Sequence, residues 1–348
     1  MSALHPLLYA NCDDKIVYQT GRGAHLQEIL SLYANVVEPG RLTFLAVGLC
    51  MLVAWGLELR LFGQCFACQM LVRFQEVKRL FNGEDERRRV MRLILEEMYR
   101  AVVQEGVENP AILGTRLFRL IKRVSGDLDP YREYKRRADL AALQAYTPLR
   151  GNLDGLTLDE LVRLSAYANS IDLGVGDYRP PKPREVVEMA QHALAVGVEE
   201  AVEALKSARN IVFILDNAGE VVFDRLLADK LRSMGKSVHA IVKSGAFQND
   251  ETVAELEYSR LQESFDSVIG SGSDAASLFL EEASREALEL ISKADLVVAK
   301  GMANYEYLSD NVERLRKPTL FLLVAKCEPI ARVLGVERKT VVARLATP

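Results

Sequence analysis

The spacing of apolar residues changes near the middle of the chain. Between Cys65 and about Lys206, apolar residues recur every three to four positions with charges on the opposite face, which predicts amphipathic helices. After Lys206, short runs rich in β-branched residues are almost wholly apolar, as in strands buried on both faces of a parallel sheet. The pattern therefore predicts a helical part followed by an α/β part.

Several of the predicted helices have recognisable ends. Pro110 occupies a first helical position, and Thr157 with Glu160 forms a capping box. Pro148 is predicted to end the helix that begins after Asp129-Pro130, because proline disrupts a helix interior. The predicted helices cover residues 70–81, 90–102, 110–125, 131–146, 158–174 and 183–206.

Strands and helices alternate in the second half of the chain. The predicted strands are 210–215, 237–242, 295–299 and 319–324, with helices at 221–234, 275–291 and 304–315. This alternation predicts an α/β fold in which a helical N-terminal domain packs on a doubly wound, mostly parallel, Rossmann-like C-terminal domain. The expected division is an atypical extension (1–64), a helical domain (65–205) and an α/β domain (206–348).

The extension contains an apolar run, Leu42–Leu57, that carries no charge. A membrane span needs about 20 apolar residues, whereas about 10–14 is more typical of a buried helix. A packed helix is the favoured interpretation. A membrane anchor and an over-extended start are the alternatives.

Composition narrows the class of protein. Of the 348 residues, 49% are hydrophobic and 26% charged, which is typical of a globular protein. The formal net charge of −4 gives no indication of a nucleic-acid partner. The chain has 5 cysteines, an odd and small number that does not suggest a disulfide scaffold. These values predict a soluble, cytoplasmic protein.

Polar residues follow each predicted strand, where open α/β sheets bind ligands. Taken singly, each of these groups is more typical of a helix cap, a turn or a solvated charge. Together they predict a site for a hard cation and an anion. The groups are Asp216-Asn217, Lys243, Asn249-Asp250, the loop Gly270–Asp274, Lys300 and Lys326.

Several motifs in order resemble one family. ILDNAGEVVFDRLLADKL (214–231), Asn249-Asp250, KGMANYE (300–306) and AKCEPIARVLG (325–335) are similar to the DUF89 family, the metal-dependent damage-control phosphatases. CFACQM (65–70) and SGDLDPYREYK (125–135) extend the resemblance to about residues 65–348, and the CxxC is like that of its microbial and archaeal branch.

The resemblance implies a phosphatase that hydrolyses phosphate monoesters of small phosphorylated metabolites. It implies that Asp216, Asn217 and Asp250 hold one divalent metal, Mn²⁺, Ni²⁺, Co²⁺ or Mg²⁺, with Asp216 acting as ligand only, as water activator or as nucleophile. The implied phosphate-binding residues are Lys300, Asn304, Tyr305, Glu306 and Lys326. Glu306 stands where other branches carry a basic residue.

Two other functions stay open at this point. One is an S-adenosylmethionine-dependent carboxyl methyltransferase, although the glycine-rich cofactor turn is absent. The other is a metal- or nucleotide-binding module without turnover. Cys65 and Cys68 have the spacing of half a zinc site or a redox pair, but buried or reversibly oxidised thiols are favoured.

Overall fold

The computed structural model describes residues 60–174 and 176–348. Residues from Arg60 to Arg332, together with Val336–Pro348, belong to one compact unit. The predicted apolar run Leu42–Leu57 lies outside the described residues. Among those described, no helix is both long and apolar enough to span a bilayer.

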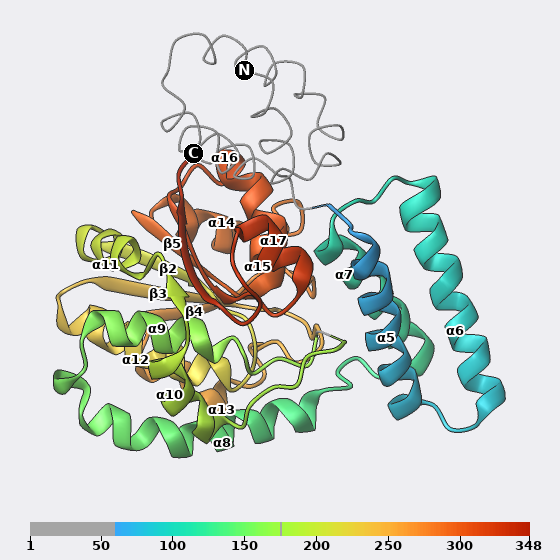
Figure 1. Cartoon of the computed structure of the whole chain (residues 1–348), viewed down its shortest axis with the longest axis horizontal. Coiled ribbons are helices and arrows are strands. Elements are labelled where there is room, and N and C mark those ends of the chain that lie inside the picture. The colour runs from blue at the N-terminus through green and yellow to red at the C-terminus, as the bar shows by residue number, and fades with distance from the viewer. Residues whose placement is uncertain (1–59, 175) are drawn as a thin grey trace, which may run out of the picture. The chain divides into compact units, whose positions relative to one another are not determined.

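A mostly parallel sheet organises the described part of the chain and confirms the α/β class (Figure 1). Its order is β1-β7-β6-β5-β2-β3-β4, in which the neighbours from β6 through β4 pair parallel and β7 pairs antiparallel with β6. The strands are β1 (Ala195–Val196), β2 (Asn210–Ile214), β3 (Ser237–Val242), β4 (Ser267–Gly270), β5 (Leu296–Lys300), β6 (Thr319–Val324) and β7 (Val341–Ala346).

The four predicted strands are confirmed as β2, β3, β5 and β6, whereas β1, β4 and β7 were not predicted. The confirmed strands are almost wholly buried, so their sequences are apolar throughout. The three others lie at or near the edges, where β4 is only half-buried and β7 carries Arg344. Edge strands need not be apolar, so their pattern is weak.

The helices described are α5 (Gly63–Leu80), α6 (Glu84–Tyr99), α7 (Pro110–Ser125), α8 (Arg132–Gly151), α9 (Leu158–Ala168), α10 (Pro183–His192), α11 (Val198–Ser207), α12 (Glu220–Ser233), α13 (Leu256–Ser259), α14 (Arg285–Ser292), α15 (Gly301–Leu308), α16 (Val312–Leu315) and α17 (Glu328–Leu334). The predicted caps are confirmed. Asn109 accepts from two backbone N–H groups at the start of α7, Gly126 ends that helix in the left-handed conformation, and Thr157 with Glu160 forms the capping box of α9.

Helices cover both faces of the sheet (Figure 1). Alternate residues of β2, Ile211 and Phe213, join one hydrophobic core with α8, α9, α11 and α12. On the other face, α14 contacts β4 and α15 contacts β5 and β6. Because α8 and α9 share this core with the sheet, a domain boundary near residue 205 stays a prediction.

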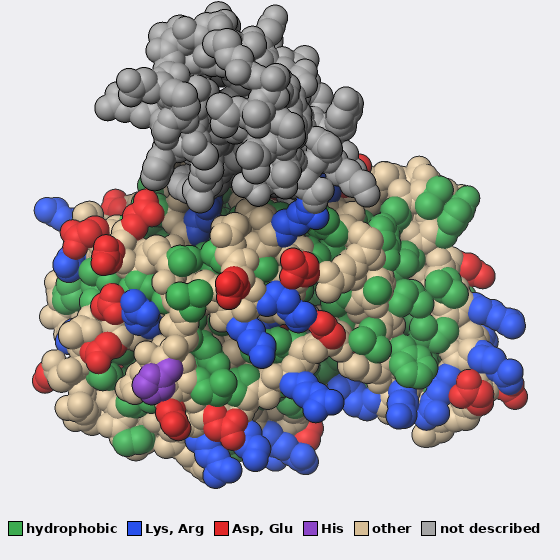
Figure 2. All heavy atoms as spheres, in the orientation of Figure 1, with side chains coloured by type: hydrophobic (Ala, Val, Ile, Leu, Met, Phe, Trp, Pro, Cys, Tyr) green, Lys and Arg blue, Asp and Glu red, His purple; other side chains and the backbone are tan. Residues whose placement is uncertain are grey.

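Helices α5, α6 and α7 lie together beside the sheet, and α7 packs against α15 (Figure 1). Apolar side chains gather over α5 and α6 on the face shown in Figure 2. The exposed hydrophobic residues of these helices include Phe74 and Tyr99. Elsewhere on the described part of this face, basic and acidic side chains are interspersed (Figure 2).

Two predicted helix ends are wrong. Helix α8 continues through Pro148 to Gly151, and Arg150 pairs there with Asp229 of α12 at 2.7 Å. This tertiary contact helps to stabilise the last turn, which lacks the hydrogen bond that proline cannot donate. The helix predicted for 183–206 is broken by β1, because Gly197 lies so close to β7 that a Cβ there would be 1.9 Å from the Ala343 carbonyl oxygen.

The helix predicted for 275–291 begins only at Arg285. The preceding residues bind other partners, since the Ala276 N–H donates to Thr115 and the Leu278 N–H donates to Asn304. These long-range partners replace helical hydrogen bonds, which no local pattern reveals. The helix predicted for 304–315 is present as α15 and α16, separated by a 3₁₀ turn.

The strand order places a topological switch between β2 and β5. These strands are neighbours, and the helices that follow them, α12 and α15, cover opposite faces of the sheet. Such a divergence opens a crevice at the carboxyl ends of the strands, where doubly wound proteins bind ligands. The residues after β2 and β5 therefore face this crevice.

Candidate functional site

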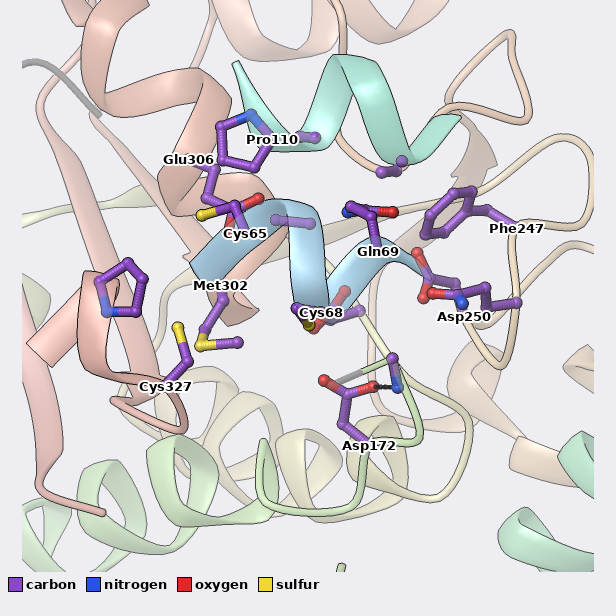
Figure 3. A pocket seen from close by; sticks show the side chains of 18 of the residues that line it. Cys65, Cys68, Gln69, Pro110, Asp172, Phe247, Asp250, Met302, Glu306 and Cys327 are labelled. Carbon is purple, nitrogen blue, oxygen red and sulfur yellow. Dashed lines mark hydrogen bonds between the residues drawn. The ribbon is translucent and has the colours of Figure 1, made fainter. Parts of the chain in front are cut away.

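A cavity of about 110 Å³ lies at this switch point (Figure 3). It is lined by the loops after β2, β3 and β6, by the start of α15, and by the first turns of α5 and α7. Its polar lining includes Gln64, Gln69, Asp172, Asp177, Asp216, Asn217, Gln248, Asp250 and Glu306.

Asp216 and Asn217 leave β2 directly into this cavity. Asp216 is almost fully buried, and its Oδ2 accepts hydrogen bonds from Asn169 Nδ2 at 3.0 Å and Asn217 Nδ2 at 2.8 Å. Gly301 allows this placement, since a Cβ there would lie 1.8 Å from the same oxygen and its φ is +82°. The KG pair after β5 thus makes room for the carboxylate that follows β2.

Asp250 reaches the same cavity from the loop after β3. Asn217 and Asp250 form an isolated antiparallel bridge, and the Glu251 N–H donates to the Asp216 carbonyl at 2.8 Å. Asp250 Oδ2 lies 3.5 Å from Lys243 Nζ and accepts no hydrogen bond. The structure therefore brings Asp216, Asn217 and Asp250 together at one wall of the cavity.

The lining of the cavity is acidic, and basic residues outside the lining compensate part of its charge. Five lining residues are acidic, and none of the described lining residues is Lys, Arg or His. Burial, reinforced by Asp250 and Glu220, raises the pKa of Asp216 well above its ordinary value. Burial also raises the pKa of Asp250 to about 7 despite the opposing effect of Lys243. A cation placed between these carboxylates would relieve the repulsion.

The donor set fits a hard divalent metal. Asp216, Asp250 and the Asn217 amide supply oxygen atoms, which Mg²⁺ and Mn²⁺ accept. Asp250 Oδ2 is a buried oxygen without a hydrogen-bond donor, as expected of a ligand atom. Within residues 60–174 and 176–348, no three His, Cys, Asp or Glu side chains converge on a metal position. An oxygen-ligand metal here would therefore use the Asn217 amide as its third protein ligand.

Lys300 lies behind the cavity rather than in its wall. It is fully buried, and its ammonium group pairs with Glu220 at 3.1 Å and Asp224 at 3.0 Å while donating to both Ser165 oxygens. Burial lowers the pKa of Lys300, but Asp224 and Glu220 outweigh this and raise it overall.

Asn304 and Tyr305 are also outside the lining. Asn304 is fully buried, donates to the Lys300 carbonyl and accepts from Ser277. The ring of Tyr305 packs edge-on against Phe321 with centroids 5.1 Å apart. A phosphate contact by either side chain stays a prediction.

Lys326 and Glu306 lie closer to the cavity. Lys326 is fully buried and donates to Asp172 Oδ2 at 2.5 Å and to the Asn169 carbonyl at 2.8 Å. Glu306 lines the cavity, and burial raises its pKa to about 8 against the lowering effect of Lys326. Their phosphate-binding role likewise stays a prediction.

The other strand-end groups have structural partners. Lys243 donates to the Ala276 carbonyl at 2.7 Å besides facing Asp250. Asp274, in the loop Gly270–Asp274, pairs with Arg119 and Lys122 of α7. Neither that loop nor Lys243 lines the cavity.

The cavity also contains residues whose placement there was not predicted. Cys65, Cys68 and Cys327 line it as free, half-buried thiols (Figure 3). Burial raises the pKa of Cys65 to about 11 and also raises that of Cys68. Asp172 lines the cavity from the loop after α9, and no spacing in the sequence distinguishes it. Only the packing of α5 and α9 against the strand ends brings these residues here.

Comparisons with known proteins identify the family of the chain. The family model "Damage-control phosphatase ARMT1-like domain" matches residues 62–342. A damage-control phosphatase of Archaeoglobus fulgidus is 30% identical, with 81% of this chain and 97% of that protein covered. An uncharacterized protein of Methanocaldococcus jannaschii is 29% identical, with 79% and 91% covered.

A damage-control phosphatase of Pyrococcus horikoshii is 32% identical, with 80% of this chain and 96% of that protein covered. The crystal structure of a DUF89 family protein from the same organism matches with a TM-score of 0.70 and 32% identity. That match covers 82% of this chain and 98% of the solved one, so the similarity extends over almost the whole length of these relatives.

Proposed function

The chain belongs to the damage-control phosphatase ARMT1-like family, and we propose that it is a metal-dependent phosphatase acting on phosphate monoesters of small metabolites. The observation that carries the proposal is the cavity at the β2–β5 switch, where Asp216, Asn217 and Asp250 meet without a neutralising side chain in the lining. A phosphate group is repelled by such a wall unless a cation accompanies it.

The three residues would hold a divalent metal: Mn²⁺, Co²⁺, Ni²⁺ or Mg²⁺. When bound, it supplies Lewis-acid stabilisation of a phosphoryl oxygen and a more acidic water. Asp216 and Asn217 are oriented for this role by hydrogen bonds from Asn169 and Asn249. Lys243, which lies outside the lining, partly neutralises the charge of Asp250.

Two other residues adapt the cavity to an anionic substrate. With a pKa near 8, Glu306 is largely protonated at neutral pH, which spares a phosphate the repulsion of one more carboxylate. Lys326 lies behind Asp172 and raises the local potential without entering the lining. Both features reduce the repulsion that a phosphate group meets in this acidic cavity.

The substrate is small and rich in hydroxyl groups. A volume of about 110 Å³ is small against the roughly 300–1,000 Å³ of sites for drug-sized ligands, which favours a compact ester such as a sugar phosphate or a phosphorylated cofactor fragment over a nucleotide. The amides of Gln64, Gln69 and Gln248 in the lining suit hydroxyl groups. Such a substrate fits the removal of surplus or damaged phosphometabolites.

Phosphate release tests the proposal. We expect hydrolysis of p-nitrophenyl phosphate and of a phosphometabolite panel in the presence of Mn²⁺, Co²⁺, Ni²⁺ or Mg²⁺, and its loss in EDTA. Asp216→Ala and Asp250→Ala should each reduce kcat at least 100-fold, as expected for loss of a metal ligand (about 3 kcal/mol).

Asp274→Asn serves as the matched control, because Asp274 is an ion-paired carboxylate outside the cavity. It should retain activity. Full metal-stimulated activity in either alanine variant would contradict the assignment of the site. Binding of S-adenosylmethionine, or tight ligand binding without phosphate release, would instead support the alternative functions.

A further inference from the structure

Two buried carboxyl groups lie behind the loops that carry Asp216 and Asp250. Asp139 is on α8, and Glu251 follows Asp250 in sequence. Both side chains are fully buried, and neither lines the cavity. The two carboxyl groups lie near each other, and burial together with the charge of Asp139 raises the pKa of Glu251. They lie between α8 and the site, and the proposed chemistry uses neither side chain.

Asp139 holds the loop after β2. Its Oδ1 accepts a hydrogen bond from the Gly219 N–H at 2.6 Å. Gly219 has a φ of +84°, and a Cβ there would lie 3.2 Å from the Ala138 side chain and carbonyl oxygen. The turn that follows Asp216-Asn217 is thus pressed against α8 at a position where glycine fits best.

Glu251 holds the loop after β3. Its N–H donates to the Asp216 carbonyl at 2.8 Å, and its carbonyl accepts from the Lys243 N–H at 3.0 Å. The Ala218 N–H also joins the two loops, donating to the Asn249 carbonyl at 2.9 Å. Asp139 therefore fixes the turn after β2 from α8, and backbone hydrogen bonds link that turn to the loop after β3.

Nearby charge does not replace the hydrogen bond between Gly219 and Asp139. Lys135, also on α8, places its ammonium group 3.0 Å from Glu255 and 3.1 Å from Asp129. An apolar residue in place of Asp139 would remove the desolvation cost of a buried carboxyl group. What the carboxyl group provides instead is a fixed hydrogen-bond geometry behind the site.

We infer that Asp139 is a positioning residue that sets the separation of Asp216 and Asp250 and so tunes the metal affinity of the site. The inference rests on the proposed metal-dependent function. Residues behind metal ligands typically change metal affinity 10–100-fold when mutated, because they fix the orientation of the ligands. Asp139 meets that description through the turn that follows Asp216-Asn217.

The test measures the Kd for Mn²⁺ by isothermal titration calorimetry, together with Tm in EDTA. Asp139→Ala should weaken Mn²⁺ binding about tenfold or more. Asp139→Asn retains an oxygen for Gly219 and adds an amide donor towards Glu251, so its Kd should stay within about threefold of wild type. Gly219→Ala disturbs the same contact from the loop side and should also weaken binding, which keeps the test available if Asp139→Ala does not fold.

Asp229→Asn is the matched control. Asp229 is a buried carboxylate of α12 that contacts Tyr146 and Arg150 of α8. These contacts lie beyond Asp139, towards the C-terminal end of α8. Asp229→Asn should lower Tm and leave the Kd for Mn²⁺ unchanged. An Asp139→Ala or Gly219→Ala protein with wild-type Kd would overturn the positioning role alone. A wild-type protein that binds no divalent metal would overturn the proposed function, and this inference with it.

Discussion

Two sets of buried charge lie beside each other at the carboxyl ends of β2 and β5. In the Lys300 cluster (Lys300, Glu220, Asp224 and Ser165), one ammonium group reaches two carboxylates and both oxygens of a serine. In the pocket set (Asp172, Asp216, Asp250 and Glu306), four acidic side chains face one cavity whose described lining holds no cation.

The difference separates structure from function. The Lys300 cluster supplies its own cation and is closed to solvent, so it behaves as a buried ion-pair network. The pocket set supplies ligand atoms but not enough positive charge, and the pKa values of Asp216, Asp250 and Glu306 are all raised by burial. The Lys300 cluster is thus complete without a ligand, whereas the pocket set needs one.

The largest effect is expected in the Lys300 cluster. Lys300→Met keeps a chain of similar length but leaves Glu220 and Asp224 buried without their ammonium partner. We expect the free energy of unfolding to fall by about 3–5 kcal/mol, measured by urea unfolding in EDTA. Lys293→Met, at an exposed position, should change it by less than about 0.5 kcal/mol. A loss below about 1 kcal/mol for Lys300→Met would show that the Lys300 cluster is not a stabilising ion-pair network.

The opposite sign is expected in the pocket set. Burial and the neighbouring Asp250 and Glu220 disfavour the ionised carboxyl of Asp216. Asp216→Asn removes this ionisable group, so in EDTA at pH 8 the free energy of unfolding should rise by on the order of 1 kcal/mol. The same variant should lose the increase in Tm that Mn²⁺ gives the wild type.

Asp274→Asn provides the contrast for this prediction. Burial disfavours the Asp274 charge, but Lys122 and Arg119 outweigh it and lower its pKa. Its replacement should therefore lower the free energy of unfolding by about 1 kcal/mol. If Asp216→Asn and Asp274→Asn lowered the free energy of unfolding equally, Asp216 would be stabilised by nearby positive charge as well as Asp274 is, and the prediction would be wrong.

A smaller effect is expected from the pH dependence of Glu306. Burial raises the pKa of this carboxyl from 4.5 to about 8, so the folded state holds its proton more tightly than the unfolded state does. In EDTA, its contribution to stability should decline as pH rises from about 4.5 to about 8 and stay constant above that.

Glu306→Gln should therefore gain on the order of 1 kcal/mol over the wild type between pH 5 and pH 6, measured by urea unfolding at both values. Glu328→Gln, at an exposed position, should show no such gain. A constant difference between Glu306→Gln and wild type across this range would show that Glu306 ionises normally.

The smallest effect is expected from the thiols of the pocket. Zinc binding and rapid disulfide exchange both need thiolates, whereas burial raises the pKa of Cys65 and Cys68. The double variant Cys65→Ser, Cys68→Ser should keep kcat within about threefold (under about 1 kcal/mol) and be as insensitive to diamide as the wild type. A tenfold loss of kcat in this variant, or one zinc per chain of wild type by native mass spectrometry, would instead show that Cys65 and Cys68 take part in catalysis or metal binding.

The central fold could be predicted because its signals are local. Strands β3 and β6 match their predicted bounds, since each is a mostly apolar run rich in β-branched residues or leucine. The caps at Asn109 and Thr157 depend on neighbouring residues alone. The end of α8, the break before α11 and the irregular stretch before α14 were predicted wrongly, because partners distant in sequence determine them.

The site could be predicted in part for the same reason. Asp216, Asn217 and Asp250 follow parallel neighbours β2 and β3, so their convergence follows from strand order. Lys300 and Lys326 also follow strands, yet both ammonium groups turn to buried protein oxygens. The sequence places a side chain at a strand end but does not indicate which nearby group it pairs with.

The sequence by itself determined the α/β class, the central strands and the family, because apolar runs, caps and motifs are carried by residues close together along the chain. Tertiary structure alone decided that α5 and α7 close the cavity with Cys65, Cys68 and Gln69, that Lys300 is confined to a closed cluster, and that Asp139 supports the turn after Asp216-Asn217. These features depend on the packing of distant segments, and the free energy of burying a charge depends on what surrounds it.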